Sequence, residues 1–339
     1  MKYNYMVCTR CMTYNHAPYI EETLRGFSMQ ETSFPVVYCI VDDASTDGEQ
    51  DILHTWAKSN LVSNEVLLSR KLDYGELISG NLVKNPNLFF VILLLYENHY
   101  KKKSKLPYIK EWNEAAKYCA ICEGDDYWTE PRKLQMQVDF MEAHPDYVMC
   151  HSDYGLTTGR YRNSKMHYEP DDNYFLYNLN VGLHVGTLTS LYRAEIDKII
   201  PMLWVGKGWP MSDYPRCIEM SHEGKIKYFP VSTAAYRILP NSASHGSIEK
   251  ELSFVEAGVE IRRFYADYYG IELPNKGYMP GYFVAIMKIA FKHKRKDIAK
   301  NCYLKARELN MVTSKLILFY LLTIFKPIGW FLNKIYTVG

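Results

Sequence analysis

The first half of the chain alternates between apolar runs typical of buried strands and segments with helical periodicity. Strands are predicted at 5–12, 36–41, 88–95 and 118–122, and the run at 36–41 is apolar throughout, as in a strand covered on both faces. A helix is predicted from Pro18, where Ile20, Leu24 and Phe27 share one face, and another from Pro131 to about residue 144. This alternation predicts an α/β fold.

Weaker signals extend the pattern. A helix is predicted to begin near residues 45–49, where Thr46 and Glu49 have the spacing of a capping box. Further strands are expected at 66–69, 148–152 and 226–237, a helix at 213–222, and a long loop region at 153–183.

The pattern changes after about residue 247, where only helical segments follow. Helices are predicted at 249–269 and, as a pair around the basic turn 292–296, at 278–310. The apolar run 316–325 ends at Lys326-Pro327 and is too short to cross a bilayer, which needs about 20 residues. We therefore predict an α/β catalytic domain over 1–247 and a helical extension over 248–339.

The composition is that of an ordinary globular protein, with 47% hydrophobic and 23% charged residues, which excludes disordered and collagen-like chains. The net charge of +2 argues against a nucleic-acid partner. Residues 276–339, however, hold 12 Lys and Arg against 2 Asp and Glu. This basic tail with its apolar end has the composition of an anchor at an anionic membrane surface. A helix packed on the catalytic domain, with solvated lysines, remains the alternative.

The cysteines indicate structural thiols. Eight Cys in 339 residues do not form a disulfide framework, and the first ten residues lack the apolar run of a signal peptide. The pairs Cys8/Cys11 and Cys119/Cys122 fall in predicted strands, where residues three apart point to opposite faces and cannot share a metal. We expect a cytoplasmic protein, peripheral at the inner face of the cell membrane.

The most informative stretch is Cys122-Glu123-Gly124-Asp125-Asp126-Tyr127-Trp128, where an apolar strand ends in acidic residues. Carboxylates then emerge at the carboxyl edge of a sheet, where open α/β folds bind ligands. Clustered carboxylates repel one another unless a cation lies among them, and Mg2+ or Mn2+ shared with a phosphate fits that need. A solvated acidic turn before the next helix is the alternative.

Two other polar stretches follow predicted strands in the same way. They are Thr13-Tyr14-Asn15-His16 after the first strand and Asp42-Asp43-Ala44-Ser45-Thr46-Asp47-Gly48 after the second. An Asp of the second stretch is suited to accept hydrogen bonds from a base or ribose, while helix capping explains part of the Ser45–Asp47 cluster. All three stretches are expected to converge on one cleft if their strands are neighbours.

Together these stretches resemble the successive landmarks of glycosyltransferase family 2, inverting nucleotide-sugar transferases with the GT-A fold. The resemblance covers residues 5–245 and implies a Rossmann-like mixed sheet flanked by helices. It implies that Thr13, Tyr14 and Asn15 line the donor pocket and that Asp43 contacts the base. Asp126 is the metal ligand it favours, with Asp125 for ribose or metal. Asp213 would be the general base, preceded by Ser212 where the family usually has an acidic residue, and Ala235-Tyr236-Arg237 matches a family motif.

The chain also departs from the family. Leu239 stands where a His is frequent, and His245 is a weak candidate to replace that metal or phosphate ligand. The basic run Lys101–Lys105 takes the place of a Gly-rich stretch, either to meet an anionic ligand or as a solvated loop. On the acceptor side, His184 and Trp128 are weak candidates, and both are equally suited to structural positions.

The function predicted from these residues is transfer of a sugar, with inversion, from a nucleotide-diphosphate sugar to a glycan or lipid-linked acceptor. It would depend on Mn2+ or Mg2+ and would belong to surface polysaccharide or lipopolysaccharide biosynthesis. The alternatives are a nucleotidyltransferase, for which the stretch 13–19 lacks a Gly-rich phosphate loop, and a non-catalytic nucleotide- or carbohydrate-binding module.

Overall fold

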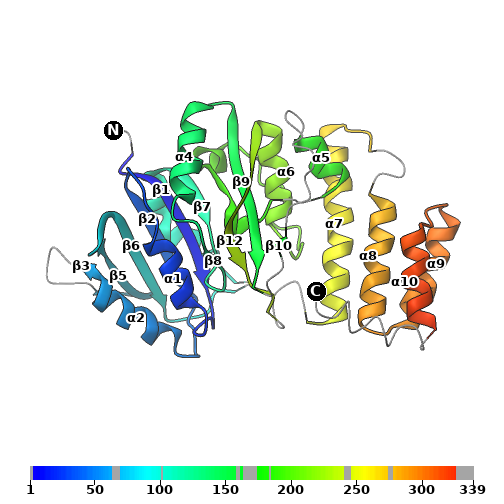
Figure 1. Cartoon of the computed structure of the whole chain (residues 1–339), viewed down its shortest axis with the longest axis horizontal. Helices are drawn as coiled ribbons and strands as arrows, with labels where there is room; N and C mark the ends of the chain where they lie inside the picture. The colour runs from blue at the N-terminus through cyan, green and yellow to red at the C-terminus, as the bar shows by residue number, and fades with distance from the viewer. Residues whose placement is uncertain are drawn as a thin grey trace. The chain divides into compact units, whose positions relative to one another are not determined.

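A computed structural model of the chain describes residues 3–62, 69–100, 102–157, 161–162, 174–182, 185–239, 246–273 and 278–325. Its strands and helices follow one another along the chain as Figure 1 shows. The strands are β1 (Tyr5–Thr13), β2 (Val36–Asp42), β3 (Leu61–Val62), β4 (Ser69–Leu72), β5 (Gly75–Leu82), β6 (Asn85–Leu95), β7 (Ala116–Ile121), β8 (Tyr127–Trp128), β9 (Tyr147–Leu156), β10 (Tyr161–Arg162), β11 (Leu191–Arg193) and β12 (Lys225–Tyr236).

The helices are α1 (Ile20–Ser28), α2 (Glu49–Asn60), α3 (Lys110–Glu114), α4 (Lys133–Ala143), α5 (Tyr174–Asn180), α6 (Asp213–Glu223), α7 (Ile248–Tyr269), α8 (Met279–Lys292), α9 (Lys296–Glu308) and α10 (Ser314–Ile324). Three short 3-10 helices are η1 (Leu106–Ile109), η2 (Thr187–Thr189) and η3 (Ala194–Lys198). The predicted strand at 66–69 lies outside the described residues except for Ser69, where β4 begins.

The strands form one mixed sheet in the order β3-β5-β6-β2-β1-β7-β11-β9-β12-β8, with β4 paired to β5 and β10 to β9. Its centre is parallel, because β1 runs parallel to both β2 and β7, and β2 runs parallel to β6. The strand β2 is buried at every position, as its continuous apolar run predicts. This parallel centre gives the sheet a carboxyl edge at which ligands bind in open α/β folds.

Both faces of the sheet are covered by apolar residues. On one face α1, α2 and α4 pack against the sheet, and α1 buries Ile20, Leu24 and Phe27 as its spacing predicts. On the other face η1 and α3 lie over β1, β2 and β6. Cys8 belongs to this second core and Cys11 to the first, so the two thiols point to opposite faces. All eight cysteines are free and buried, which confirms that they are structural thiols.

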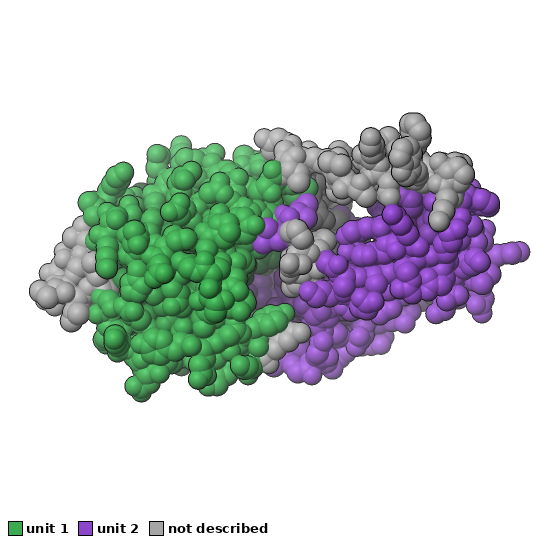
Figure 2. Space-filling view, turned by 90° about the horizontal axis from the view of Figure 1, so that it is seen from below, with its two compact units in different colours: residues 1–172, 185–200, 223–237 green, residues 173–184, 201–222, 238–339 purple. Residues whose placement is uncertain are grey.

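The chain divides into two compact units, drawn in different colours in Figure 2. The first comprises residues 1–172, 185–200 and 223–237 and contains the sheet, and the second comprises residues 173–184, 201–222 and 238–339. This division differs from the predicted boundary at residue 247, because α5 and α6 pack against α7 through Leu179, Ile218, Ile261 and Tyr265.

The second unit is helical, as the sequence predicts. The helix α7 begins where the Ser247 hydroxyl accepts a hydrogen bond from the Lys250 N–H, and it ends at Gly270, whose φ of 65° suits glycine. The helices α8, α9 and α10 share an apolar core that includes Met287, Cys302 and Phe319. In the part of the chain that the structure describes, no helix is both long and apolar enough to cross a membrane.

Candidate functional site

The three polar stretches meet at the carboxyl edge of the sheet. Thr13 at the end of β1 lies in register with Asp42 at the end of β2. The Gly124 N–H, three residues beyond β7, donates to the Met12 carbonyl at 3.1 Å. The Met12 N–H in turn donates to the Glu123 carboxylate at 3.0 Å. The expected convergence is therefore confirmed within the first unit.

Glu49, the first residue of α2, connects two of these stretches. Its buried carboxylate accepts hydrogen bonds from the Thr13 hydroxyl, from the His16 N–H at 2.8 Å and from the Ser45 hydroxyl at 2.9 Å. Burial raises the pKa of Glu49, against the opposing effect of these hydrogen bonds. The predicted capping box with Thr46 is wrong, because the residue before the helix is Gly48 and the Glu49 N–H donates to the Asp47 carboxylate at 3.2 Å. The Glu49 carboxylate bonds to the loop after β1 instead.

Asp43 is buried and already bonded within the protein. Its carboxylate accepts from the His99 N–H at 2.7 Å and forms an ion pair with the Lys105 ammonium at 2.9 Å. The next residue, Ala44, has a φ of 62°, a strained conformation for a residue other than glycine. Lys105 is the last residue of the basic run 101–105, for which the sequence suggested either contact with an anionic ligand or a solvated loop. In the structure Lys105 instead forms an ion pair with Asp43 inside the protein.

The acidic stretch after β7 concentrates three carboxylates. Burial and the neighbouring Asp125 raise the pKa of Asp126 to about 8, and the same two causes raise the pKa of Glu123 to about 7. Asp125 is the most accessible of the two aspartates, because its side chain is 22% exposed while Asp126 is 4% exposed. One Asp125 oxygen lies 3.9 Å from His16 Nε2. The three carboxylates therefore crowd one another, and in the absence of a cation Glu123 and Asp126 favour their protonated forms near neutral pH.

Arg237, at the end of β12, fixes this stretch in place. Its backbone N–H donates to the Asp126 carboxylate at 2.8 Å, and its guanidinium donates to the Asp125 carbonyl and pairs with Glu22. The guanidinium carbon lies 4.8 Å from the ring centre of Tyr19 and 4.7 Å from that of Tyr127. Because Arg237 is only 7% exposed, it acts as a positioning residue for the two aspartates.

Gly124 allows the acidic stretch to approach β1 closely. A Cβ atom at this position would lie 2.1 Å from the Thr13 hydroxyl oxygen, 2.5 Å from Thr13 Cβ and 3.1 Å from His16 Nδ1. Only glycine leaves room for both strands to end side by side here. The sequence shows a glycine in the motif, but it does not indicate that a side chain at this position would clash with Thr13.

A divalent cation fits the carboxylates that the structure presents. Within the described residues, no three His, Cys, Asp or Glu side chains are grouped so that they alone could hold a metal ion. Asp125 and Asp126 offer two carboxylates, and hard cations such as Mg2+ are typically held by one or two carboxylates together with substrate phosphates and water. A cation bound there would stabilise the ionised form of Asp126, which burial and the neighbouring Asp125 disfavour.

The remaining donor-side and acceptor-side candidates occupy different environments. Tyr14 is 44% exposed, whereas Thr13 is buried and its hydroxyl is used by Glu49. Asn15 has a φ of 56°, and its side-chain oxygen accepts from the Thr46 N–H at 2.8 Å, which joins the two loops. His184 and His245 lie outside the described residues.

Trp128 is a core residue. It is 1% exposed, its indole N–H donates to the Leu188 carbonyl at 2.8 Å, and its ring contacts Phe27 edge to face. The ammonium of the buried Lys133 lies 4.3 Å from the ring centre. The expected acceptor-side role of Trp128 is corrected accordingly, because both the faces and the polar atom of the ring are used inside the protein.

Asp213 is the first residue of α6 in the second unit. It is exposed, and its carboxylate accepts from the Tyr214 N–H at 2.8 Å. The same helix carries the buried Glu219, which accepts from the Met202 N–H at 2.7 Å and the Leu203 N–H at 2.8 Å. Glu219 thus holds one end of the loop that leads to Asp213, a role that no sequence pattern signals.

Comparisons with known proteins give the fold. No family model matches the chain. The uncharacterized protein Rv1520 of Mycobacterium tuberculosis (strain ATCC 25618 / H37Rv) is 34% identical over 141 residues, which make up 41% of this chain and 32% of that protein. The uncharacterized protein Mb1547 of Mycobacterium bovis matches with the same identity and coverage. The chain therefore spans about a third, 32%, of the length of the curated relatives it matches.

Among solved structures, the mannosyltransferase PcManGT from Pyrobaculum calidifontis in complex with GDP-Man and Mn2+ has a TM-score of 0.52 at 14% identity, and the match covers 97% of this chain and 88% of that one. The chain has the GT-A fold. This confirms the predicted fold class, a mixed α/β sheet with C-terminal helices. The S. aureus TarS fragment 1–349 in complex with UDP matches with a TM-score of 0.47 at 16% identity over 94% of this chain and 90% of that one.

Proposed function

We propose that the protein is a metal-dependent inverting glycosyltransferase that moves a sugar from a nucleoside-diphosphate sugar to a glycan or lipid-linked acceptor. The observation that carries the proposal is the cluster of three carboxylates, Glu123, Asp125 and Asp126, at the carboxyl edge of a GT-A sheet. A solved structure with the same fold is a mannosyltransferase in complex with GDP-Man and Mn2+, a nucleotide sugar and a cation of the kind proposed.

Asp125 and Asp126 would hold Mn2+ or Mg2+ together with the diphosphate of the donor. When bound, the cation offsets the negative charge that grows on the leaving nucleoside diphosphate. Asp126 has one oxygen engaged by the Arg237 N–H, and Asp125 is the more exposed side chain. We therefore propose Asp125 as the main metal ligand and Asp126, which is buried and held in orientation by Arg237, as the second ligand.

The donor nucleotide would lie beside the loop after β1. Tyr14 presents an exposed ring there, and rings of this kind stack on nucleobases. Asp43 would contribute to base recognition together with Lys105, because the two side chains form one buried ion pair. Thr13 and Asn15 would shape this pocket through their contacts to Glu49 and Thr46.

Asp213 would act as the general base. In an inverting transfer the acceptor hydroxyl attacks the anomeric carbon from the side opposite the leaving group, and a carboxylate takes its proton. Asp213 is an exposed residue, but the surrounding protein shields its carboxylate from water and raises its pKa. Its helix is anchored through Glu219. The proposed role of Asp213 rests on the resemblance of residues 212–213 to the motif of glycosyltransferase family 2, in which Ser212 replaces the usual acidic residue.

The second unit would lie at an anionic membrane surface, where a lipid-linked acceptor is found. The helix α10 exposes Ile317, Leu318 and Leu321 at 40%, 50% and 44%, and Phe325, the residue directly after the helix, is 55% exposed. The exposed Lys315 lies close enough to Lys288 that, with burial, it lowers the pKa of Lys288. Exposed apolar side chains next to lysines are typical of helices that lie in the headgroup region of anionic lipids.

The membrane proposal is tested by sedimentation with vesicles. The wild-type chain should sediment with phosphatidylglycerol vesicles and not with phosphatidylcholine vesicles. The double substitution Leu318→Glu/Leu321→Glu should release it, while Val83→Glu, at another exposed apolar position, should not. Equal sedimentation of the double variant and the wild type would overturn this part of the proposal.

The activity is tested by incubating the protein with a panel of nucleoside-diphosphate sugars, Mn2+ and pooled glycan and lipid-linked acceptors. We expect release of nucleoside diphosphate that needs Mn2+ and is lost in Asp125→Asn and Asp213→Asn, with donor binding retained in the second variant. Asp51→Asn, at an exposed carboxylate of α2, is the matched control and should keep full activity. Pyrophosphate release from nucleoside triphosphates would favour a nucleotidyltransferase instead, and wild-type rates in Asp213→Asn would remove it as the base.

A further inference from the structure

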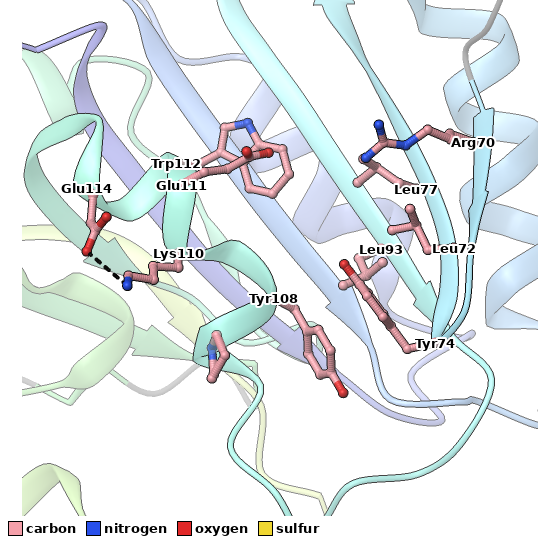
Figure 3. Close-up of a pocket in the computed structure, with 11 residues that line it drawn as sticks. Arg70, Leu72, Tyr74, Leu77, Leu93, Tyr108, Lys110, Glu111, Trp112 and Glu114 are labelled. Carbon is pink, nitrogen blue, oxygen red and sulfur yellow. Dashed lines mark ion pairs between the residues drawn. The ribbon is translucent and has the colours of Figure 1, made fainter.

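A pocket of about 450 Å3 opens on the face of the sheet that carries η1 and α3. Figure 3 shows it between the hairpin of β4 and β5 on one side and the segment 107–114 on the other. None of its lining residues belongs to the stretches at the carboxyl edge described above. Its volume lies within the range of about 300–1,000 Å3 that is usual for small-molecule sites.

The pocket is rich in aromatic side chains. Tyr74, Tyr108 and Trp112 line it, and the rings of Tyr74 and Tyr108 have their centres 4.5 Å apart. Leu77 and Leu93, which face each other across β5 and β6, add apolar surface. Such rings offer broad apolar faces with polar edges, a combination that suits the mixed C–H and O–H surface of a sugar ring.

The formal charges of the side chains that line the pocket sum to zero. Lys110 and Glu114 form an ion pair at 3.8 Å, drawn as a dashed line in Figure 3. The other two charged side chains are Arg70 on β4 and Glu111 on α3, and neither has a side-chain hydrogen bond or ion pair within the described residues. The pocket thus combines a planar hydrogen-bond donor and a hydrogen-bond acceptor at zero formal charge.

We propose that this pocket binds a neutral saccharide, one or two hexose units of the acceptor glycan. A phosphate or a nucleotide would need a net positive charge, which Glu111 and Glu114 cancel. Arg70 and Glu111 are both exposed, and a purely apolar ligand would use neither of them. Sugar hydroxyls both donate and accept, so they satisfy Glu111 and Arg70 together while the ring contacts Trp112.

The pocket is joined to the proposed donor region by stacked rings. His99 stacks on Tyr108 with ring centres 5.5 Å apart, and the His99 N–H donates to Asp43 at 2.7 Å. A bound saccharide would therefore lie against the loop that carries Lys105. The assignment of this saccharide to the acceptor rests on the proposed function, whereas its binding in the pocket does not.

The test is ligand-observed saturation-transfer NMR on the full chain with neutral disaccharides built from glucose, galactose, mannose and their N-acetylamino forms. We expect at least one disaccharide to bind, with affinity reduced tenfold or more in Trp112→Ala and about fivefold in Arg70→Ala. Lys71→Ala is the matched control, because neighbouring side chains of a strand point to opposite faces, and it should bind as the wild type does. Circular dichroism and the melting temperature show whether each variant is folded.

Three results would overturn the proposal: no disaccharide binds, the affinity is unchanged in both Trp112→Ala and Arg70→Ala, or inorganic phosphate displaces the saccharide. The proposed function is read separately, from nucleoside-diphosphate release. Transfer activity without saccharide binding at Trp112 refutes the pocket alone. Saccharide binding that depends on Trp112 in a protein without transfer activity supports the pocket as a saccharide site and refutes the proposed function.

Discussion

Replacing Gly124 with alanine should lower the stability of the protein and disturb the proposed metal ligands Asp125 and Asp126. The new Cβ would lie 2.1 Å from the Thr13 hydroxyl oxygen and 2.5 Å from Thr13 Cβ, well inside contact distance. Thr13 cannot move away freely, because it is buried and its hydroxyl donates to Glu49. Overpacking of this kind costs about 1–3 kcal/mol, and the reduced freedom of the unfolded chain returns less than about 1 kcal/mol of that. We expect a net loss of about 1–2 kcal/mol.

The matched control is Gly155→Ala in β9, where a Cβ would meet no atom within 4 Å. Urea denaturation followed by tryptophan fluorescence should show the loss for Gly124→Ala and a change of less than about 0.5 kcal/mol for Gly155→Ala. In a double-mutant cycle, Thr13→Ala should recover part of the loss, because it removes the nearer of the two clashing atoms. If Gly124→Ala proves as stable as Gly155→Ala, the close approach of β1 and the acidic stretch is refuted.

Three further predictions concern charged groups. The pKa of Asp126, raised to about 8 by burial and Asp125, exceeds its ordinary value of 3.8, so the stability that its protonated form provides is full below pH 3.8 and is lost as the pH rises through 8. In EDTA, Asp126→Asn should flatten this fall in melting temperature, and equal slopes would contradict it. Burial lowers the pKa of Lys133 to about 8, so Lys133→Met should melt higher than the wild type at pH 7 and the gap should close near pH 10; a constant gap would argue against a buried ammonium. Arg237→Lys should lower the free energy of unfolding by about 2 kcal/mol in urea denaturation, because the guanidinium contacts to the Asp125 carbonyl and to Glu22 are lost. Arg132→Lys, at an exposed position, should have no measurable effect, and equal effects of the two substitutions would exclude the positioning role of Arg237.

The parallel centre of the fold follows from local sequence pattern. β2 is apolar at each position from 36 to 41, and α1 repeats its apolar residues at helical spacing. Both elements can therefore be predicted from their own sequence, without knowing which elements they pack against. The hairpin of β4 and β5 cannot be predicted from local sequence in this way. β5 contains Gly75, Gly80 and Asn81, which have low strand propensity, and it is a strand because it pairs with β6 along its length.

The site was predictable in its location and less so in its contacts. Three strands ending in polar residues indicate a shared edge, and the contact between Met12 and Glu123 confirms it. The partners of Glu49 and Lys105 were not predictable, because both side chains bond to residues 33 or more positions away, and a local pattern favours a nearer role. For Glu49 the local pattern was a capping box, and for Lys105 it was a run of solvated lysines.

Trp128 shows that the role of a single residue cannot always be predicted from sequence. An aromatic residue beside carboxylates has the same sequence signature whether it faces a ligand or the core. The structure decides for the core through Phe27, Leu188 and Lys133, which lie far from it in sequence or on the next helix.

The most direct test of the central claim is calorimetric titration of nucleoside-diphosphate sugars into the protein, with Mn2+ and with EDTA. The account predicts that at least one UDP-, GDP- or TDP-sugar binds in Mn2+, that EDTA abolishes the binding, and that Asp125→Asn weakens it tenfold or more while Asp51→Asn leaves it unchanged. Donor binding of equal affinity in Mn2+ and EDTA, or in the wild type and Asp125→Asn, would contradict the claim that these carboxylates bind the donor through a divalent cation.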